Sequence, residues 1–118
     1  MNYSNDHRKE IELVLDGEKL KNKEQLLKAI KEGLCFPDYF GFNWDALQDC
    51  ITDLSWLQGI AKVDVVIKNS SKLLNDEDDS SLQVFLEIMD YAVSFWNSEV
   101  KDSLPLPGMD ISFRYYLE

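Results

Sequence analysis

Acidic and aromatic residues gather in one segment of this 118-residue chain, residues 36–54, which reads FPDYFGFNWDALQDCITDL and contains no lysine or arginine. Asp45 and Asp49 are four residues apart, so a helix would place both carboxylates on one face. Carboxylates gathered in this way can bind a metal ion, or they can meet the positive charges of a partner. The same pattern also fits a merely solvated helix face, and these residues alone leave that alternative open.

A short helix is expected to position these carboxylates. Asn43 is a good N-cap, because its side-chain oxygen can accept a hydrogen bond from a free amide of the first turn. The spacing then predicts a helix from Trp44 to about Leu54. Its apolar face consists of Leu47, Cys50, Ile51 and Leu54, and its opposite face of Asp45, Asp49 and Thr52. Two like charges at this spacing cost about 0.2–0.5 kcal/mol, so stability alone does not explain them.

Three short motifs follow one another in this segment: Pro37-Asp38-Tyr39-Phe40-Gly41, then Asn43-Trp44-Asp45-Ala46-Leu47, then Asp49-Cys50. Weaker matches occur at Leu15-Asp16-Gly17-Glu18, at Leu82-Gln83-Val84-Phe85 followed by Glu87, and at Asp110-Ile111-Ser112. In this order, and over most of the chain, the motifs resemble those of the barstar family, the intracellular inhibitors of secreted barnase-type ribonucleases. The resemblance implies an inhibitor that has no catalytic activity of its own.

The resemblance also implies a surface that binds the nuclease. Carried over by motif position, it comprises Tyr39, Asn43, Asp45, Asp49, Thr52 and Glu87. Asp49 would enter the nuclease active site where an RNA phosphate lies, and Tyr39, Asp45 and Glu87 would support it. Five positions depart from the family pattern: Phe40 replaces a tyrosine, Phe42 a glutamate, Trp44 a leucine, Gln48 a tryptophan and Asp53 a glycine. We include Trp44 and Gln48 in the predicted surface, where such changes bear on which nuclease is bound.

The net charge of −10 is concentrated in two windows of the sequence. Residues 32–61 contain five acidic residues, residues 73–100 contain seven, and neither window contains a lysine or arginine. If the two windows lie side by side in the fold, they focus a negative potential that repels nucleic acid and attracts a basic protein. The run Asp76-Glu77-Asp78-Asp79 is interpreted as a flexible, solubilising loop.

We expect a single domain spanning residues 1–118, with residues 1–7 as a flexible N-terminal tail. No apolar run approaches the roughly 20 residues that span a bilayer, and residues 1–7 lack the apolar stretch of a signal peptide, so we expect a cytoplasmic protein. Cys35 and Cys50 are too few for a disulfide framework, and Cys50 falls on the buried face of its helix. The single histidine gives no zinc-ligand spacing, and we expect neither a metal nor a cofactor.

Strands and helices alternate along the chain. Strands are expected at residues 10–15, 61–68 and 110–117, and helices at residues 22–31, 44–54 and 80–96. Asn22 caps the first helix and Gly33 stops it, while Ser80 and Gln83 form a capping box for the last. The core stripe of that last helix consists of Leu82, Phe85, Leu86, Met89, Val93 and Trp96, and Glu87 points away from it. This order predicts an α/β fold with a three-stranded parallel sheet packed with about four helices, as the family resemblance also implies.

Other functions remain as alternatives. Residues 13–17, LVLDG, are faintly similar to the loop of phosphotransferases that use an aspartate nucleophile, but Val14 stands at the nucleophile position and cannot react. A metal site formed by Asp45, Asp49 and Glu87 is conceivable, although it lacks the usual place at a strand end. We expect no enzyme, but a protein that is monomeric when free and binds a basic extracellular-type ribonuclease or nuclease toxin domain, with no contact to nucleic acid or membrane. The alternative is an acidic docking module for a basic partner that is not a nuclease.

Overall fold

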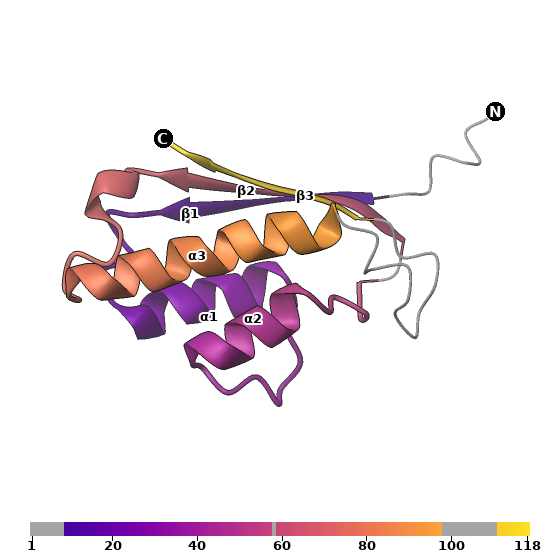
Figure 1. Ribbon diagram of the computed structural model, residues 1–118, viewed down its shortest axis with the longest axis horizontal. Coiled ribbons are helices and arrows are strands. Elements are labelled where there is room, and N and C mark those ends of the chain that lie inside the picture. Colours follow the sequence, from indigo (N-terminus) through magenta and orange to yellow (C-terminus); the bar gives the residue numbers. More distant parts are fainter. Residues whose placement is uncertain (1–8, 58, 98–110) are drawn as a thin grey trace.

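The computed structural model describes residues 9–57, 59–97 and 111–118, and the predicted tail at residues 1–7 lies outside this part of the chain. The elements are β1 (Lys9–Asp16), α1 (Lys23–Gly33), α2 (Trp44–Ile51), β2 (Ile60–Lys68), the 3-10 helix η2 (Ser70–Lys72), α3 (Asp79–Trp96) and β3 (Ser112–Leu117). Figure 1 shows α1, α2 and α3 together on one side of the sheet. The arrangement is an α/β fold with two layers.

The three strands form a parallel sheet in the order β1-β2-β3. The predicted three-stranded parallel sheet is therefore confirmed. The predicted count of four helices is too high, because the described residues form three α-helices and one turn of 3-10 helix. Asn69 adopts a left-handed conformation and its carbonyl accepts a hydrogen bond from the Lys72 amide at 2.9 Å, which closes that turn after a single revolution.

The core lies between the sheet and the helices. Along β2, Val63, Val65 and Ile67 are buried, while the alternating side chains are at most half-buried. The same alternation leaves Val14 and Tyr116 exposed on the sheet face opposite the helices. The inward positions of β3 include buried Phe113, whereas Asp110, the expected first residue of this strand, lies outside the described residues.

Two helix ends differ from the sequence prediction. Asn22 and Gln25 form a capping box at the start of α1, but Gly33 is the last helical residue and not the stop. A Cβ atom at Gly33 would lie 2.3 Å from Cδ1 of Leu13, so the glycine is needed for close packing on β1. Helix α2 ends at Ile51, short of the predicted Leu54, because Leu54 adopts a left-handed backbone with φ of 52° while its side chain stays buried.

Helix α3 begins differently from the expected capping box at Ser80. Asp78 is the N-cap, and its carboxylate accepts hydrogen bonds from the Ser81 amide and the Ser80 hydroxyl. The preceding Glu77 carboxylate accepts the Lys23 amide at 2.9 Å, which ties the loop to the start of α1. The interpretation of residues 76–79 as a solubilising loop is therefore wrong, because two of its carboxylates have structural partners.

The buried face of α3 agrees in part with the predicted stripe. Phe85, Met89 and Trp96 are buried as expected. Leu82, Leu86 and Val93 are half-buried, and the stripe also includes Ile88 and Ala92. The wider face follows from contact with both the sheet and α2, since a helix between two neighbours buries more than one narrow stripe.

Candidate protein-binding surface

The loop before α2 is fixed by Asn43. Its side-chain oxygen accepts the Ala46 amide at 2.7 Å, and its side-chain nitrogen donates to the Gly41 carbonyl at 3.2 Å. The predicted N-cap is thereby confirmed. Each end of the amide makes one hydrogen bond inside the chain, so Asn43 positions the surface, while one N–H and one oxygen lone pair remain open to a partner.

Helix α2 separates apolar from acidic side chains as its spacing predicted. Leu47, Cys50 and Ile51 are buried, whereas Asp45, Gln48 and Asp49 are exposed. The next residue, Thr52, is half-buried, and its hydroxyl donates to the Gln48 carbonyl at 2.8 Å. Thr52 therefore closes the last turn of the helix, and the side chains open to a partner are those of Asp45, Gln48 and Asp49.

Helix α2 packs against α3, so the described helical parts of the two acidic windows lie side by side (Figure 1). The ring centroids of Trp44 and Phe85 are 6.3 Å apart, and the Trp96 indole donates to the Ile51 carbonyl at 2.9 Å. Trp44 is half-buried, and the Lys23 ammonium lies 5.9 Å from the centre of its ring. Of the predicted surface residues, Trp44 is thus mainly a packing residue between the helices.

Glu87 is exposed on α3 and adds a carboxylate from the second window. The Gln83 side chain donates to it at 3.3 Å, which holds it along the helix. Tyr91, which is half exposed, lies one turn further on and shares this face through its i, i+4 spacing. Sequence reasoning did not include Tyr91, although that spacing from Glu87 was visible.

Tyr39 projects from the loop before α2, with 73% of its surface exposed. Desolvation raises the pKa of its hydroxyl above the ordinary value of 10.0, and the neighbouring Cys50 and Asp53 add to the rise. Burial likewise raises the pKa of the Cys50 thiol, followed by the charges of Asp53 and Asp49. Asp53 is exposed two residues after the end of α2, although it was not among the predicted surface residues.

We call the exposed carboxylates of Asp45, Asp49, Asp53 and Glu87 the acidic surface. Among the described residues the ion pairs join Lys31 to Asp38, Lys62 to Asp64 and Lys72 to Glu18, and none of them includes a member of this surface. No group of three potential metal ligands occurs in the same part of the chain, so the suggested metal site at Asp45, Asp49 and Glu87 finds no support. Within the described residues, the four carboxylates of the acidic surface therefore form no ion pair.

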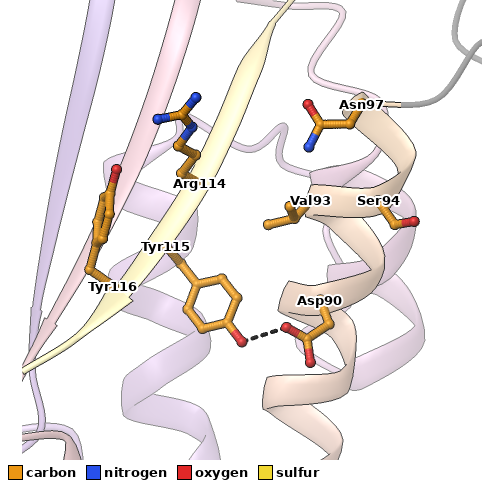
Figure 2. Close-up of a pocket in the computed structure, with 7 residues that line it drawn as sticks. All are labelled: Asp90, Val93, Ser94, Asn97, Arg114, Tyr115 and Tyr116. Carbon is orange, nitrogen blue, oxygen red and sulfur yellow. Dashed lines mark hydrogen bonds between the residues drawn. The ribbon is translucent and has the colours of Figure 1, made fainter.

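A separate hollow of 860 Å³ lies between α3 and β3, and none of the predicted surface residues lines it (Figure 2). Tyr115 points from β3 toward α3 and donates to the Asp90 carboxylate at 2.5 Å, while Arg114 and Tyr116 lie on the other side of the strand. Burial, followed by that hydrogen bond and the charge of Asp90, raises the pKa of Tyr115 to about 12. The hollow is lined by neither cysteine nor histidine.

None of the described helices is long and apolar enough to pass through a lipid bilayer.

The two-layer fold and the acidic surface define a small α/β protein that presents uncompensated carboxylates to a partner. Comparison with known proteins identifies the family: a model of the family described as "Barstar (barnase inhibitor)" matches residues 11–105, and the chain belongs to this family. The chain is also 37% identical, over 78 residues, to "Putative ribonuclease inhibitor YrdF" of Bacillus subtilis (strain 168). That match covers 64% of this chain and 81% of the Bacillus protein.

Proposed function

We propose that this protein is a ribonuclease inhibitor whose acidic surface occupies the active site of a basic ribonuclease. Membership of the barstar family and the similarity to YrdF support a ribonuclease-inhibitor role in general. The observation that carries the mechanism is the exposed Asp49 on α2, flanked by Asp45 and Asp53 and lacking a described cationic partner. Repulsion between like charges at this spacing lowers the stability of the helix. We therefore attribute the row of carboxylates to the binding of a cationic partner.

The chemistry of the target explains the fit. A ribonuclease that cleaves by attack of the 2′-hydroxyl must hold an anionic phosphate, and arginine, lysine and histidine side chains commonly do so. Such a cleft is left with uncompensated positive charge when RNA is absent. Asp49 supplies the missing anion, Asp45 and Glu87 pair with cations at the rim, and Tyr39 packs on a base-binding or imidazole ring. Gln48, between the carboxylates, adds a neutral donor and acceptor.

Rigidity makes the surface effective. Each side chain that must be ordered on binding costs about 0.5–1.5 kcal/mol, so a surface that is already fixed binds more tightly. The Asn43 cap fixes the start of α2, and the hydrogen bond from Trp96 to Ile51 fixes its end against α3. The carboxylates are therefore presented by a braced helix.

The proposal extends to the biological setting. The target is a basic extracellular-type ribonuclease or the nuclease domain of a toxin, and the inhibitor acts as a monomer in the cytoplasm, where it protects the producing cell as an immunity protein. The protein itself binds no RNA, because its net charge of −10 repels phosphate, and it catalyses no cleavage.

The direct test is an RNA-cleavage assay with barnase and a panel of basic secreted bacterial ribonucleases, each titrated with the purified protein. We expect at least one nuclease to lose its activity at a one-to-one ratio, and the protein alone to leave RNA intact. If no nuclease in the panel is inhibited while basic proteins without nuclease activity bind, the protein is a docking module of another kind. Metal-dependent cleavage by the protein alone would also contradict the proposal.

A further inference from the structure

Phe42 is an aromatic residue in an unusual place. Its backbone adopts a left-handed conformation with φ of 51°, which bulky residues rarely occupy. Even so, 41% of its surface is exposed. If the ring were buried, the free energy gained from burying its apolar surface could offset the strain of this backbone conformation. Here much of the ring remains in water, so packing alone does not account for it.

The ring is nevertheless held in a defined orientation. Phe42 contacts Phe40 with ring centroids 5.0 Å apart, and Phe40 contacts Phe36 at the same separation. Phe36 in turn meets Trp56 edge to face at 5.7 Å, and the Trp56 indole donates to the Leu34 carbonyl at 2.9 Å. Phe42 is therefore the outer end of a chain of rings that is rooted in the core.

The position of Phe42 relates it to the acidic surface. It directly precedes Asn43, the N-cap of α2, whereas Tyr39 comes four residues before that cap. The loop before the carboxylate row thus carries two exposed aromatic rings. With a rise of about 1.5 Å per residue, the N-cap Asn43 lies roughly 9 Å along the helix axis from Asp49.

A hollow of 440 Å³ adjoins the ring on the side of α1, and its other lining residues are Glu24, Gln25 and Lys28. One wall is aromatic and the opposite wall is polar with both signs of charge. A partner chain that covers Phe42 would therefore bury the ring at the edge of the acidic surface without burying a further cluster of like charge.

We propose that Phe42 is a second aromatic anchor of the inhibitor surface, which inserts into an apolar pocket of the target ribonuclease beside its cationic active-site cleft. This inference rests on the proposed function and adds a specificity determinant to it. Aromatic anchors that enter a pocket commonly carry much of the binding energy at an interface, while charges at the solvated rim mainly set the rate of association. A nuclease with a basic cleft but no adjacent apolar pocket is then bound less tightly.

The test uses the full-length protein and the nuclease that it inhibits in the panel containing barnase. Phe42→Asn removes the ring but keeps a residue that tolerates the left-handed backbone, and Phe42→Gly is a second variant of the same kind. Tyr116→Thr is the matched control, because Tyr116 is 44% exposed on the sheet face opposite the helices and threonine suits a strand. Asp49→Ala tests the proposed function in parallel, and circular dichroism and thermal melting verify that each variant folds.

We expect both Phe42 variants to dissociate about tenfold faster or more, with association rates nearly unchanged because no charge is altered. Tyr116→Thr should leave both rates unchanged. If Asp49→Ala weakens the complex while folded Phe42→Asn and Phe42→Gly bind like the wild type, the inference is wrong and the proposed function stands. If the wild type inhibits no nuclease in the panel, or if Asp49→Ala has no effect, the proposed function fails and the inference fails with it.

Discussion

Asp49 has an acidic neighbour one helical turn before it on α2, Asp45, and a second acidic residue, Asp53, follows in the turn after the helix. Sequence spacing was sufficient to place Asp45 and Asp49 on the exposed face of α2, because the buried positions Leu47 and Ile51 fix the phase of the helix. It was not sufficient for Asp53, which follows the helix. The helix ends at Ile51 and Leu54 adopts a left-handed backbone, and the spacing of the apolar residues carries no signal of this stop.

The same limit applies to Phe42 and Thr52. The sequence gives no sign that an aromatic residue adopts a positive φ, since only glycine and asparagine commonly do so. Thr52 lies at the position that the family surface implies, but its hydroxyl bonds to the helix backbone at Gln48. Motif position therefore gives a prediction of which residues form the surface, while the structural role of a single residue such as Thr52 depends on local hydrogen bonds.

At the residue scale, alanine substitutions of the four main surface residues should weaken the complex to different degrees. Asp45→Ala and Tyr39→Ala should weaken the complex less than Asp49→Ala, because they act beside the anion and not in its place. Glu87→Ala should have the smallest effect, of about 0–1 kcal/mol, if its partner is a solvated cation at the rim. Dissociation constants of the four variants with the inhibited nuclease measure this order. If Glu87→Ala raised the dissociation constant more than Asp49→Ala, the ranking would be wrong and the centre of the binding surface would lie on α3.

The Tyr115 hydroxyl gives a prediction about stability. Tyr115→Phe removes the hydrogen bond to Asp90 and should lower the free energy of unfolding at pH 7 by about 1 kcal/mol. Because the pKa of Tyr115 rises from 10.0 to about 12 on folding, the native state keeps a proton that the unfolded state loses. Wild-type stability should therefore fall between about pH 10 and pH 12, and the variant should fall less. Urea unfolding over this range measures the difference, and equal slopes for the two proteins would contradict the assignment.

At the element scale, the periods of the apolar residues were enough to find all three strands and all three α-helices of the described chain. The ends were harder, because a cap depends on which of several polar residues reaches the first turn. Ser80 and Asp78 both precede α3, and the carboxylate of Asp78 is the one that accepts the Ser81 amide. At the end of α1, Gly33 serves packing against Leu13 and not termination.

The cap of α3 can be tested by Asp78→Ala, with Asp76→Ala as the matched control in the same loop. Asp78→Ala should lower the urea midpoint at pH 7 and Asp76→Ala should not, because only Asp78 caps the helix with its side chain. The Ser80 hydroxyl and the Ser81 amide lower the pKa of Asp78 below 3.8. Its contribution is therefore complete above that pH and disappears as the pH falls through the folded-state pKa, so the wild type and Asp78→Ala should converge in acid. A difference that does not shrink at any pH as the solution is made more acidic than pH 3.8 would mean that the ionised carboxylate is not the cap.

At the scale of the whole molecule, the contact between α2 and α3 unites two acidic windows that are far apart in the sequence. From the sequence, the proximity of the two windows was only an assumption, since the order of strands and helices does not determine which helices are in contact. In the structure the two helices are in contact through Trp44 against Phe85 and Trp96 against Ile51. The resulting potential belongs to the fold and not to any one residue.

The potential should govern the rate of association. Raising the ionic strength from 0.01 M to 0.15 M shortens the Debye length from about 30 Å to about 8 Å, so the association rate with a basic nuclease should fall about tenfold or more. The dissociation rate should change far less, because close contacts are screened weakly. Stopped-flow measurements across this range provide the test. An association rate that is indifferent to salt would show that the acidic residues only keep the protein soluble.

The central claim is that Asp49 takes the place of an RNA phosphate in a nuclease active site, and a comparison of inhibition constants for Asp49→Ala and Glu12→Ala tests it most directly. Both substitutions remove one exposed negative charge, but Glu12 alternates with inward-facing Leu13 on β1 and lies on the sheet face opposite α2. Asp49→Ala should weaken inhibition by about 2–5 kcal/mol, because it leaves desolvated cations of the nuclease unpaired. Glu12→Ala should change it by less than about 1 kcal/mol. Equal losses for the two folded variants would contradict the account, because they would reduce Asp49 to one charge among many.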